Sequence, residues 1–167
     1  MTGLPVDAAT FRRALGSFAS GVTVVAVRDA AGVDHGMTVS AFCSVSLEPP
    51  LVLVCIDHAA TCAPRIAVAT HVGISLLAGE QSALSRRFAD PDADRFDGVD
   101  VTRGATGVPL LAGALAHLEC RIVARHPGGD HTIVVGEVLA AHARGGDPLV
   151  YFRGRYGAVH PTEDPPR

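Results

Sequence analysis

A run of short hydroxyl side chains between Gly36 and Pro50 offers the most specific chemistry in this chain. If the run is extended, successive side chains point to opposite faces. The odd positions are then all apolar. The even positions carry four hydroxyls and one aromatic ring, and they are Thr38, Ser40, Phe42, Ser44 and Ser46. Solvent-facing strands usually carry charged or long side chains, and this face has neither. A face of short hydroxyls suits the close approach of a flat ligand with polar edges.

Three further groups could contact a ligand, and each also has a plain structural explanation. His131 follows Asp130 at a turn that could present its imidazole near a redox or proton-transfer centre, or it is a turn histidine that Asp130 orients. Thr61 lies in a loop after the apolar strand 51–56. The hydroxyl and backbone N–H groups of this loop could hold a phosphate, or the loop is simply solvated. The segment 151–156 combines three aromatic rings with two arginines. This composition suits a stacked, phosphorylated ligand, or a hairpin that packs its rings into the core.

Several catalytic classes are excluded by what the sequence lacks. The 14 Lys and Arg positions are all Arg, which excludes a P-loop lysine, a Schiff-base lysine and a lysine general base. No GxGxxG follows a strand, and there is no GxSxG or HExxH motif. His117 and Glu119 would share a strand face, but such a pair is more typical of a solvated surface than of a metal site. Arg86 and Arg87 could add positive charge near the phosphate loop, although a solvated helix face explains Arg86 better.

Composition favours one globular domain in a reducing compartment. The 167 residues are 48% apolar, with a net charge of −3 and no basic stripe, so nucleic-acid binding is not expected. No apolar run is long enough to cross a bilayer, and the first 11 residues lack a signal-peptide pattern, so we expect a cytoplasmic protein without membrane contact. We interpret the four cysteines as small buried hydrophobes. They are Cys43, Cys55, Cys62 and Cys120.

The order of elements predicts a mainly β fold. A helix begins after Asp7, with apolar residues at helical spacing up to Phe18, and ends at Gly21. Short helices are expected from Pro64 and over 81–89, with a polar excursion from 90 to 109 that could cover a site. The expected strands are 22–27, the opening run, 51–56, 72–77, 114–125, 131–142 and a final short pair at 149–152 and 155–159. About seven strands with short connections favour a closed antiparallel barrel with peripheral helices. The domain spans 1–160, and the Pro-rich tail 161–167 is expected to be disordered.

Several stretches together resemble the flavin reductase domain family, the reductase components of two-component flavin-dependent monooxygenases. The resemblance extends from about Phe11 to about Val159. The stretches are Phe11–Val25, Gly36–Phe42, Ser46–Leu53, Gly128–Thr132 and Tyr151–Gly154. The resemblance implies a split antiparallel β-barrel of Greek-key type that forms a homodimer. It also implies that NADH or NADPH passes hydride to FMN or FAD, and that the reduced flavin leaves for a partner oxygenase.

The same resemblance assigns expected contacts to individual residues. Those matching the segments that bind flavin are Thr38, Val39, Ser40, Ser44, Val45, Cys55, Ile56, Asp57, Thr61, Cys62, Arg87 and Phe88. Among these, Thr61 and Cys62 match the positions that receive the phosphate. His131 matches a histidine beside the nicotinamide. The residues matching the nicotinamide-cofactor segment are Phe152, Arg153, Gly154 and Arg155.

The phosphate loop departs from the family pattern. Relatives commonly have more Ser, Thr or basic residues there, whereas this chain has His58-Ala-Ala-Thr-Cys62. The strength of phosphate binding and the choice between FMN and FAD therefore stay open. A flavin- or haem-binding protein without turnover is the alternative from another class. An oxidase of the pyridoxamine-phosphate type would need a basic phosphate grip that this Lys-free loop lacks.

Overall fold

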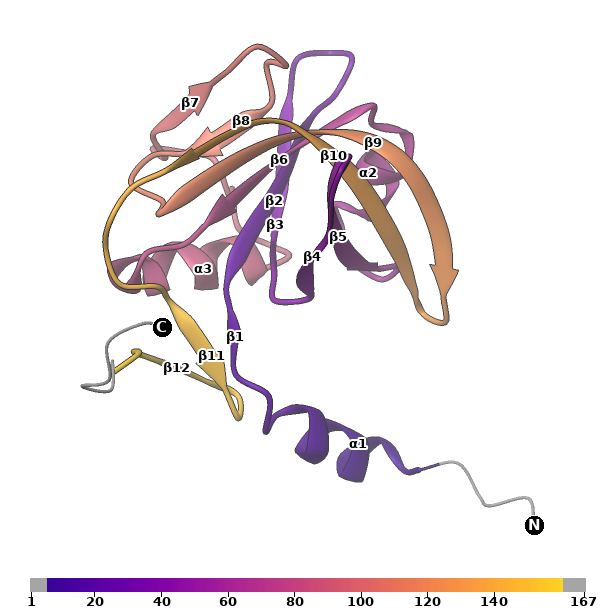
Figure 1. Cartoon of the computed structure of the whole chain (residues 1–167), viewed down its shortest axis with the longest axis vertical. Coiled ribbons are helices and arrows are strands. Elements are labelled where there is room, and N and C mark those ends of the chain that lie inside the picture. The colour runs from indigo at the N-terminus through magenta and orange to yellow at the C-terminus, as the bar shows by residue number, and fades with distance from the viewer. Residues whose placement is uncertain (1–5, 161–167) are drawn as a thin grey trace.

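The main sheet has seven strands, all antiparallel, and it curls into a barrel (Figure 1). The computed structural model describes residues 6–160. The strand order across the sheet is β3-β2-β6-β9-β10-β5-β4. The strands are β2 (Thr23–Arg28), β3 (Asp34–Val39), β4 (Phe42–Leu47), β5 (Pro50–Asp57), β6 (His71–Leu76), β9 (Ala116–Gly128) and β10 (His131–Ala143). The mainly β, antiparallel barrel predicted from the sequence is confirmed.

The hydroxyl-rich run is not one extended strand, as the sequence pattern assumed. It forms two strands, β3 and β4, which lie at opposite edges of the main sheet. The chain changes direction at Ser40 and Ala41, and the pairing of β4 with β5 shifts register between Ser44 and Ser46. Because alternation of side chains cannot continue through a corner and a register shift, the predicted single hydroxyl face does not form.

Two hydrophobic clusters hold the barrel together. The first fills the barrel with alternate residues of its strands, including Val25, Val54, Ile74 and Val134. The second lies outside the sheet, under helix α3 (Ser82–Ala89), where the ring of Phe88 is completely buried. β5 alternates buried and half-buried residues, so one of its faces points into the barrel and the other toward the surface.

The N-terminal helix stands away from the barrel (Figure 1). Helix α1 (Ala8–Leu15) begins as predicted, because the side chain of Asp7 accepts a hydrogen bond from the Thr10 N–H at 2.9 Å. It ends at Leu15 with Gly16 as its cap, rather than at Gly21. The residues after it form the short strand β1 (Ser20–Gly21), which pairs with the C-terminal strand β11 (Val150–Phe152). Residues 8–21 are called the arm below.

Two hairpins end in tight two-residue turns. β9 and β10 meet at Gly129 and Asp130, as the sequence predicts, with Gly129 at φ 74°. β11 and β12 (Arg155–Gly157) meet at Arg153 and Gly154, with φ of 48° and 77°. Positive φ at both turn positions is the geometry that matches the twist of a two-residue hairpin, and it places Arg153 at the tip. The remaining elements are helix α2 (Ala63–Val68), the 3-10 helix η1 (Gly79–Gln81), β7 (Val101–Arg103) and β8 (Pro109–Leu111).

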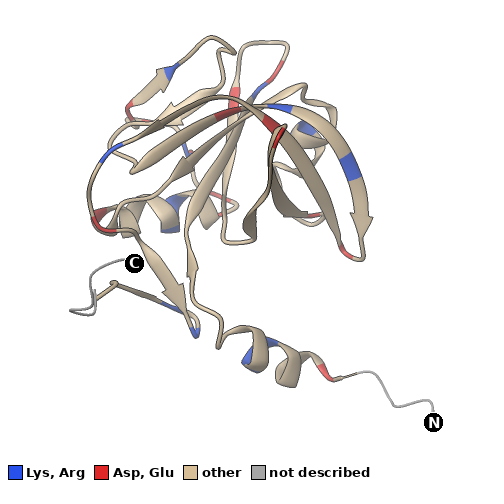
Figure 2. Cartoon of the chain, in the orientation of Figure 1, with Lys and Arg blue, Asp and Glu red and all other residues tan. Residues whose placement is uncertain are grey.

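Charged residues of both signs are scattered over the ribbon (Figure 2). The His117–Glu119 pair is not a solvated surface, contrary to the sequence interpretation. Glu119 is buried and accepts hydrogen bonds from the N–H and hydroxyl of Thr106, and the His117 ring bonds to the carbonyl oxygen of Leu111. These contacts tie the segment before β8 onto β9. The described residues contain no helix long and apolar enough to span a membrane.

The four cysteines are all free thiols, but they are not all buried as expected. Cys62 and Cys120 are buried, Cys55 is half-buried and Cys43 is exposed. Burial raises the pKa of the Cys62 thiol to about 11, because it disfavours the thiolate. Cys62 is therefore a protonated packing group at neutral pH rather than a nucleophile. The expected tail lies outside the described residues.

Candidate functional site

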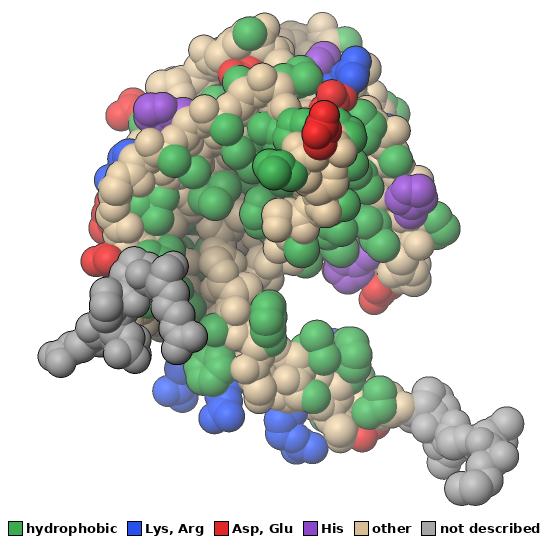
Figure 3. Space-filling model, in the orientation of Figure 1, with side chains coloured by type: hydrophobic (Ala, Val, Ile, Leu, Met, Phe, Trp, Pro, Cys, Tyr) green, Lys and Arg blue, Asp and Glu red, His purple; other side chains and the backbone are tan. Residues whose placement is uncertain are grey.

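A hollow of about 660 Å³ lies between the arm and the barrel. We call it the arm groove. Figure 3 shows hydrophobic side chains on both the barrel and α1 facing this gap. Its lining comes from the arm, the β3–β4 corner with the start of β4, the outer face of β5, and the β11–β12 hairpin. These residues are Phe11, Arg12, Leu15, Gly16, Phe18, Ser20, Ser40, Ala41, Phe42, Cys43, Leu53, Cys55, Tyr151, Arg153 and Gly154.

The composition of the arm groove suits an aromatic ligand that carries negative charge. Its volume lies within the usual range for small-molecule sites, and its walls are largely apolar with a few polar groups. Two arginines, Arg12 and Arg153, reach it, and the described residues that line it include no carboxylate. The hairpin tip is held against the arm, because the N–H of Arg153 donates to the carbonyl oxygen of Gly16 at 3.0 Å.

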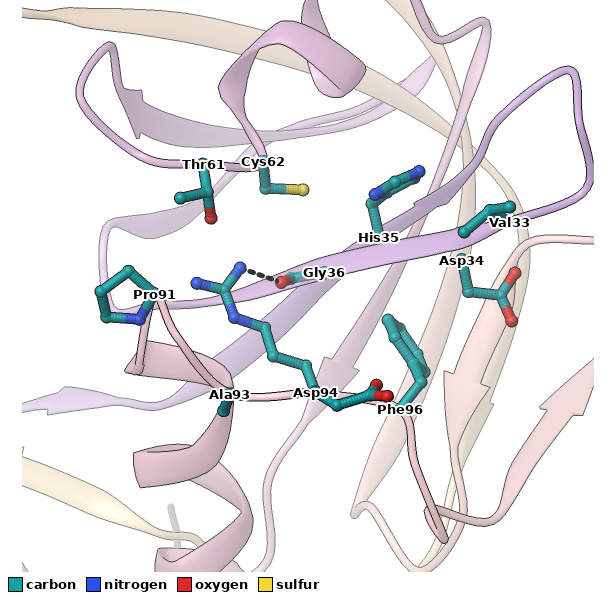
Figure 4. Close-up of a pocket in the computed structure, with 11 residues that line it drawn as sticks. Val33, Asp34, His35, Gly36, Thr61, Cys62, Pro91, Ala93, Asp94 and Phe96 are labelled. Atoms are coloured by element: carbon teal, nitrogen blue, oxygen red, sulfur yellow. Dashed lines mark hydrogen bonds between the residues drawn. The ribbon is translucent and has the colours of Figure 1, made fainter.

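A second hollow, of about 420 Å³, lies under the polar excursion and is shown in Figure 4. We call it the loop pocket. One wall is the start of β3 with Val33 before it, and another is the loop end at Thr61 and Cys62, next to α2. The third wall belongs to the excursion, at Pro91 and residues 93–96. The excursion therefore covers one side of a pocket.

The excursion is held in place although most of it has no regular secondary structure. The Arg87 guanidinium donates from Nε to the carbonyl oxygen of Asp94 at 3.0 Å and from Nη2 to that of Asp97 at 2.5 Å. The rings of Phe88 and Phe96 meet edge to face with centroids 5.0 Å apart. Two consecutive residues of α3 thus fix the loop, one through hydrogen bonds and the other through packing.

Arg95 lies between these anchors and lines the loop pocket. Its Nε donates to the carbonyl oxygen of Asp90 at 2.9 Å, and its Nη1 donates to that of Gly36 at 2.8 Å. The second bond is the dashed line in Figure 4. Arg95 is not among the site residues expected from the sequence. The available signal was the pair Arg95-Phe96, which repeats the pair Arg87-Phe88 eight residues earlier.

His131 lies at the tip of the β9–β10 hairpin, half-buried, opposite Asp57 on β5. Its Nδ1 is 2.7 Å from Oδ1 of Asp130, and this hydrogen bond lowers the pKa of the Asp130 carboxyl. The carboxylate therefore fixes which way the ring faces and leaves Nε2 for another partner. This is the Asp130 contact that the turn interpretation expected, and it is equally compatible with a role near the nicotinamide.

The structure brings some of the predicted site residues together. Ser40 and Cys55, matched to flavin segments, line the arm groove together with Arg153 and Gly154, matched to the nicotinamide segment. Thr61 and Cys62, matched to the phosphate positions, line the loop pocket instead.

Other predicted residues have visible structural roles. Val39, Ile56 and Phe88 are buried core side chains. The Thr38 hydroxyl donates to the carbonyl oxygen of Ser85 at 2.7 Å, and Arg87 holds the excursion. The remaining side chains are exposed on strands or turns, and they are Ser44, Val45, Asp57, Phe152 and Arg155.

Comparisons with known proteins agree with the motifs. The model of the flavin reductase like domain matches residues 15–160. The chain is 47% identical over 148 residues to the FMN reductase (NADH) SmoA of Agrobacterium fabrum, covering 89% of this chain and 84% of that protein. It is 46% identical over 158 residues to the reductase component of the 4-nitrophenol 4-monooxygenase/4-nitrocatechol 2-monooxygenase of Rhodococcus opacus, covering 94% and 84%.

A solved structure extends the agreement to the fold. The NADH:FAD oxidoreductase SgcE6 of Streptomyces globisporus, in complex with NAD and FAD fragments, matches with a TM-score of 0.89 and 40% identity. The match covers 97% of this chain and 100% of that one. Motifs, fold and near full-length similarity lead to one conclusion: the chain belongs to the flavin reductase like domain family.

Proposed function

We propose that this protein is an NADH-dependent flavin reductase that reduces FMN or FAD and supplies the reduced flavin to a partner monooxygenase. One observation carries the proposal beyond family membership. Residues matched separately to flavin segments, Ser40 and Cys55, share the arm groove with residues matched to the nicotinamide segment, Arg153 and Gly154. Hydride transfer needs two rings in one hollow, and this shared lining supports the proposal.

The residues that line the arm groove fit this chemistry. Flavin supplies the hydride acceptor, so the protein has to bind and orient two rings rather than provide a nucleophile. On the barrel side of the groove, Phe42 and Leu53 provide aromatic and apolar surface, and Ser40 provides a hydroxyl. Arg153 lines the groove and adds a positive charge that suits the phosphates of a dinucleotide. The absence of lysine from the sequence is no obstacle to such a reaction.

We also propose a homodimer, in which a second copy covers the arm. The arm exposes Phe11, Leu15 and Phe18, which are 53%, 56% and 78% accessible. On β4, Leu47 is 91% accessible. Large apolar side chains exposed along an arm that stands away from its own barrel are typical of a surface that is buried by a partner.

The proposed location is the cytoplasm, where NADH is available. The four free thiols support a reducing compartment.

An anaerobic assay tests the activity directly. NADH or NADPH is mixed with FMN, FAD or riboflavin, and the loss of the visible absorbance of oxidised flavin is followed. The proposal expects rapid, protein-dependent loss with NADH. Flavin that binds without being reduced would instead identify a non-catalytic flavin-binding protein. A Soret band on addition of haem, without flavin binding, would identify a haem-binding one.

The role of His131 is tested separately. The variant His131→Ala should slow NADH-dependent flavin reduction in single turnover and leave the dissociation constant of the flavin nearly unchanged, because the ring is expected beside the nicotinamide. Asp130→Asn keeps the shape of the turn but weakens the contact that orients the ring, so it should slow reduction by a smaller factor than His131→Ala. Unchanged single-turnover rates in His131→Ala would remove His131 from the reaction.

A further inference from the structure

The Arg95 guanidinium has hydrogen-bonding capacity that the fold does not use. A guanidinium carries five N–H donors, and two of them bond to the carbonyl oxygens of Asp90 and Gly36. The described residues offer no acceptor to the other three. The group is half-buried and lines the loop pocket. A positively charged fork is thus fixed by two backbone contacts, with its free side available to a ligand.

The wall opposite Arg95 is the loop whose Thr61 and Cys62 are expected from the family resemblance to receive the phosphate. Thr61 is exposed there, and Cys62 lies beside it at the start of α2. In Figure 4 the Arg95–Gly36 hydrogen bond lies below Thr61 and Cys62, across the pocket. The positive charges of Arg95 and Arg65 oppose the effect of burial on the pKa of Cys62, in keeping with the position of Arg95 across the pocket from this loop.

The other charged groups of the pocket are already paired or lie elsewhere. Asp34 pairs with Arg28 at 3.2 Å and also with Arg103. Nε2 of His35 lies 2.9 Å from Oδ2 of Asp29. Asp94 points toward Phe96 in Figure 4, away from Thr61. A ligand between Thr61 and the excursion would therefore meet the positive charge of Arg95 first.

We propose that Arg95 and Thr61 bind the phosphate of the flavin between them, so that Arg95 selects phosphorylated flavins over riboflavin. The guanidinium fork matches two phosphate oxygens, and the Thr61 hydroxyl donates to a third. Arg95 would supply from the excursion the charge that the Lys-free loop 58–62 lacks. This inference rests on the proposed function only in taking flavin as the ligand.

Equilibrium binding of FMN and riboflavin, followed by flavin fluorescence, tests the inference without turnover. The two ligands differ only in the phosphate. Arg95→Gln should weaken FMN binding about 10- to 100-fold, the size expected for a charge-assisted contact, and change riboflavin binding less than about twofold. Thr61→Val should weaken FMN binding by a smaller factor, again sparing riboflavin. Arg95→Lys, which keeps the charge but not the fork, should restore part of the loss.

Arg65→Gln is the matched control, because Arg65 is an exposed arginine on α2 that does not line the pocket. If direct contact between Arg95 and the phosphate matters, rather than positive charge anywhere nearby, Arg65→Gln should change the dissociation constants of FMN and riboflavin less than about twofold. Equal weakening of FMN and riboflavin in Arg95→Gln would give Arg95 a purely structural role and overturn the inference, and so would unchanged FMN binding.

The outcomes separate this inference from the proposed function. If the unmodified protein reduces flavin but Arg95→Gln does not weaken FMN binding specifically, only the inference is contradicted. If Arg95→Gln weakens FMN binding specifically but the unmodified protein does not reduce flavin with NADH or NADPH, only the proposed function is contradicted.

Discussion

Gly36 on β3 allows the excursion to pack against the barrel, and Gly36→Ala should disturb that packing. A Cβ at this position would lie 3.1 Å from Cε1 of Phe88, 3.1 Å from Cζ of Phe96 and 3.3 Å from the Cβ of Ala26. None of these groups can easily move, because Phe88 is completely buried, the two rings pack against each other, and Ala26 belongs to the neighbouring strand β2.

The expected loss of stability is the difference between two effects. Overpacking of this kind costs about 1–3 kcal/mol. Replacing a strand glycine by alanine raises the free energy of unfolding by roughly 0.5–1 kcal/mol, because the unfolded chain loses conformational freedom. The free energy of unfolding should therefore fall by about 1 kcal/mol, within a range of roughly 0 to 2.5 kcal/mol, as measured by urea denaturation followed by circular dichroism.

Gly157→Ala is the control, because this strand glycine has no atom within 4 Å of the added Cβ. It should leave stability unchanged or raise it by roughly 0.5–1 kcal/mol, so the difference between the two variants isolates the steric effect. Phe96→Leu should also cost less in the Gly36→Ala background than alone, by about 0.5 kcal/mol or more. A Gly36→Ala protein as stable as Gly157→Ala would refute the packing argument.

Three further predictions concern buried charge, a buried thiol and the arm. Burial favours the neutral form of Glu119, but the hydrogen bonds from Thr106 outweigh it and lower its pKa. The stabilisation of the folded protein by the ionised Glu119 carboxylate is therefore fully present above the pKa of Glu119 in the unfolded chain. It is lost as pH falls through the lower pKa of the folded protein. Glu119→Gln should cost about 1–3 kcal/mol at pH 7 in urea denaturation and converge with the unmodified protein in acid, whereas a constant difference would contradict this assignment. Burial raises the pKa of Cys120 from 9.0 to about 12, so only the unfolded state ionises as pH rises above 9. Stability should then fall between pH 8 and pH 10 by about 1.4 kcal/mol more than in Cys120→Ala, and parallel pH profiles would argue against a buried thiol. Phe18→Asp should shift the molecular mass from dimer to monomer in light scattering, while Val68→Asp, an equally exposed site on α2, should not. A dimer that survives Phe18→Asp would exclude the arm from the interface.

Local patterns were sufficient to predict most elements of the fold. The β9–β10 hairpin follows from Gly129-Asp130 between two β-rich runs, and the start of α1 follows from the cap at Asp7. The end of α1 was placed too late, because the chain from Gly16 onward leaves the helix to pair with β11. Ser20 pairs with Tyr151, far along the sequence. Pairing between residues so distant in sequence leaves no local signal.

The candidate site was predictable only in part, for a related reason. Ser40, Cys55 and Arg153 were found one segment at a time, each on its own motif. Arg95 was not found, because its significance comes from facing Thr61 across a pocket, and it lies in a segment with no periodicity to interpret.

The sequence by itself determined the strand-rich composition, the main turns and the family motifs, because these depend on residue types and short spacings. It also excluded lysine chemistry. Only the tertiary structure decided that the hydroxyl-rich run divides into two strands at opposite edges of the sheet, since closing the barrel requires a corner at Ser40 and Ala41. The same closure places the two hollows along β3, with Gly36 lining the loop pocket and Ser40, just after the strand, lining the arm groove. It also brings Arg95 into the second pocket, because the rings of Phe88 and Phe96 can meet only where Gly36 leaves space.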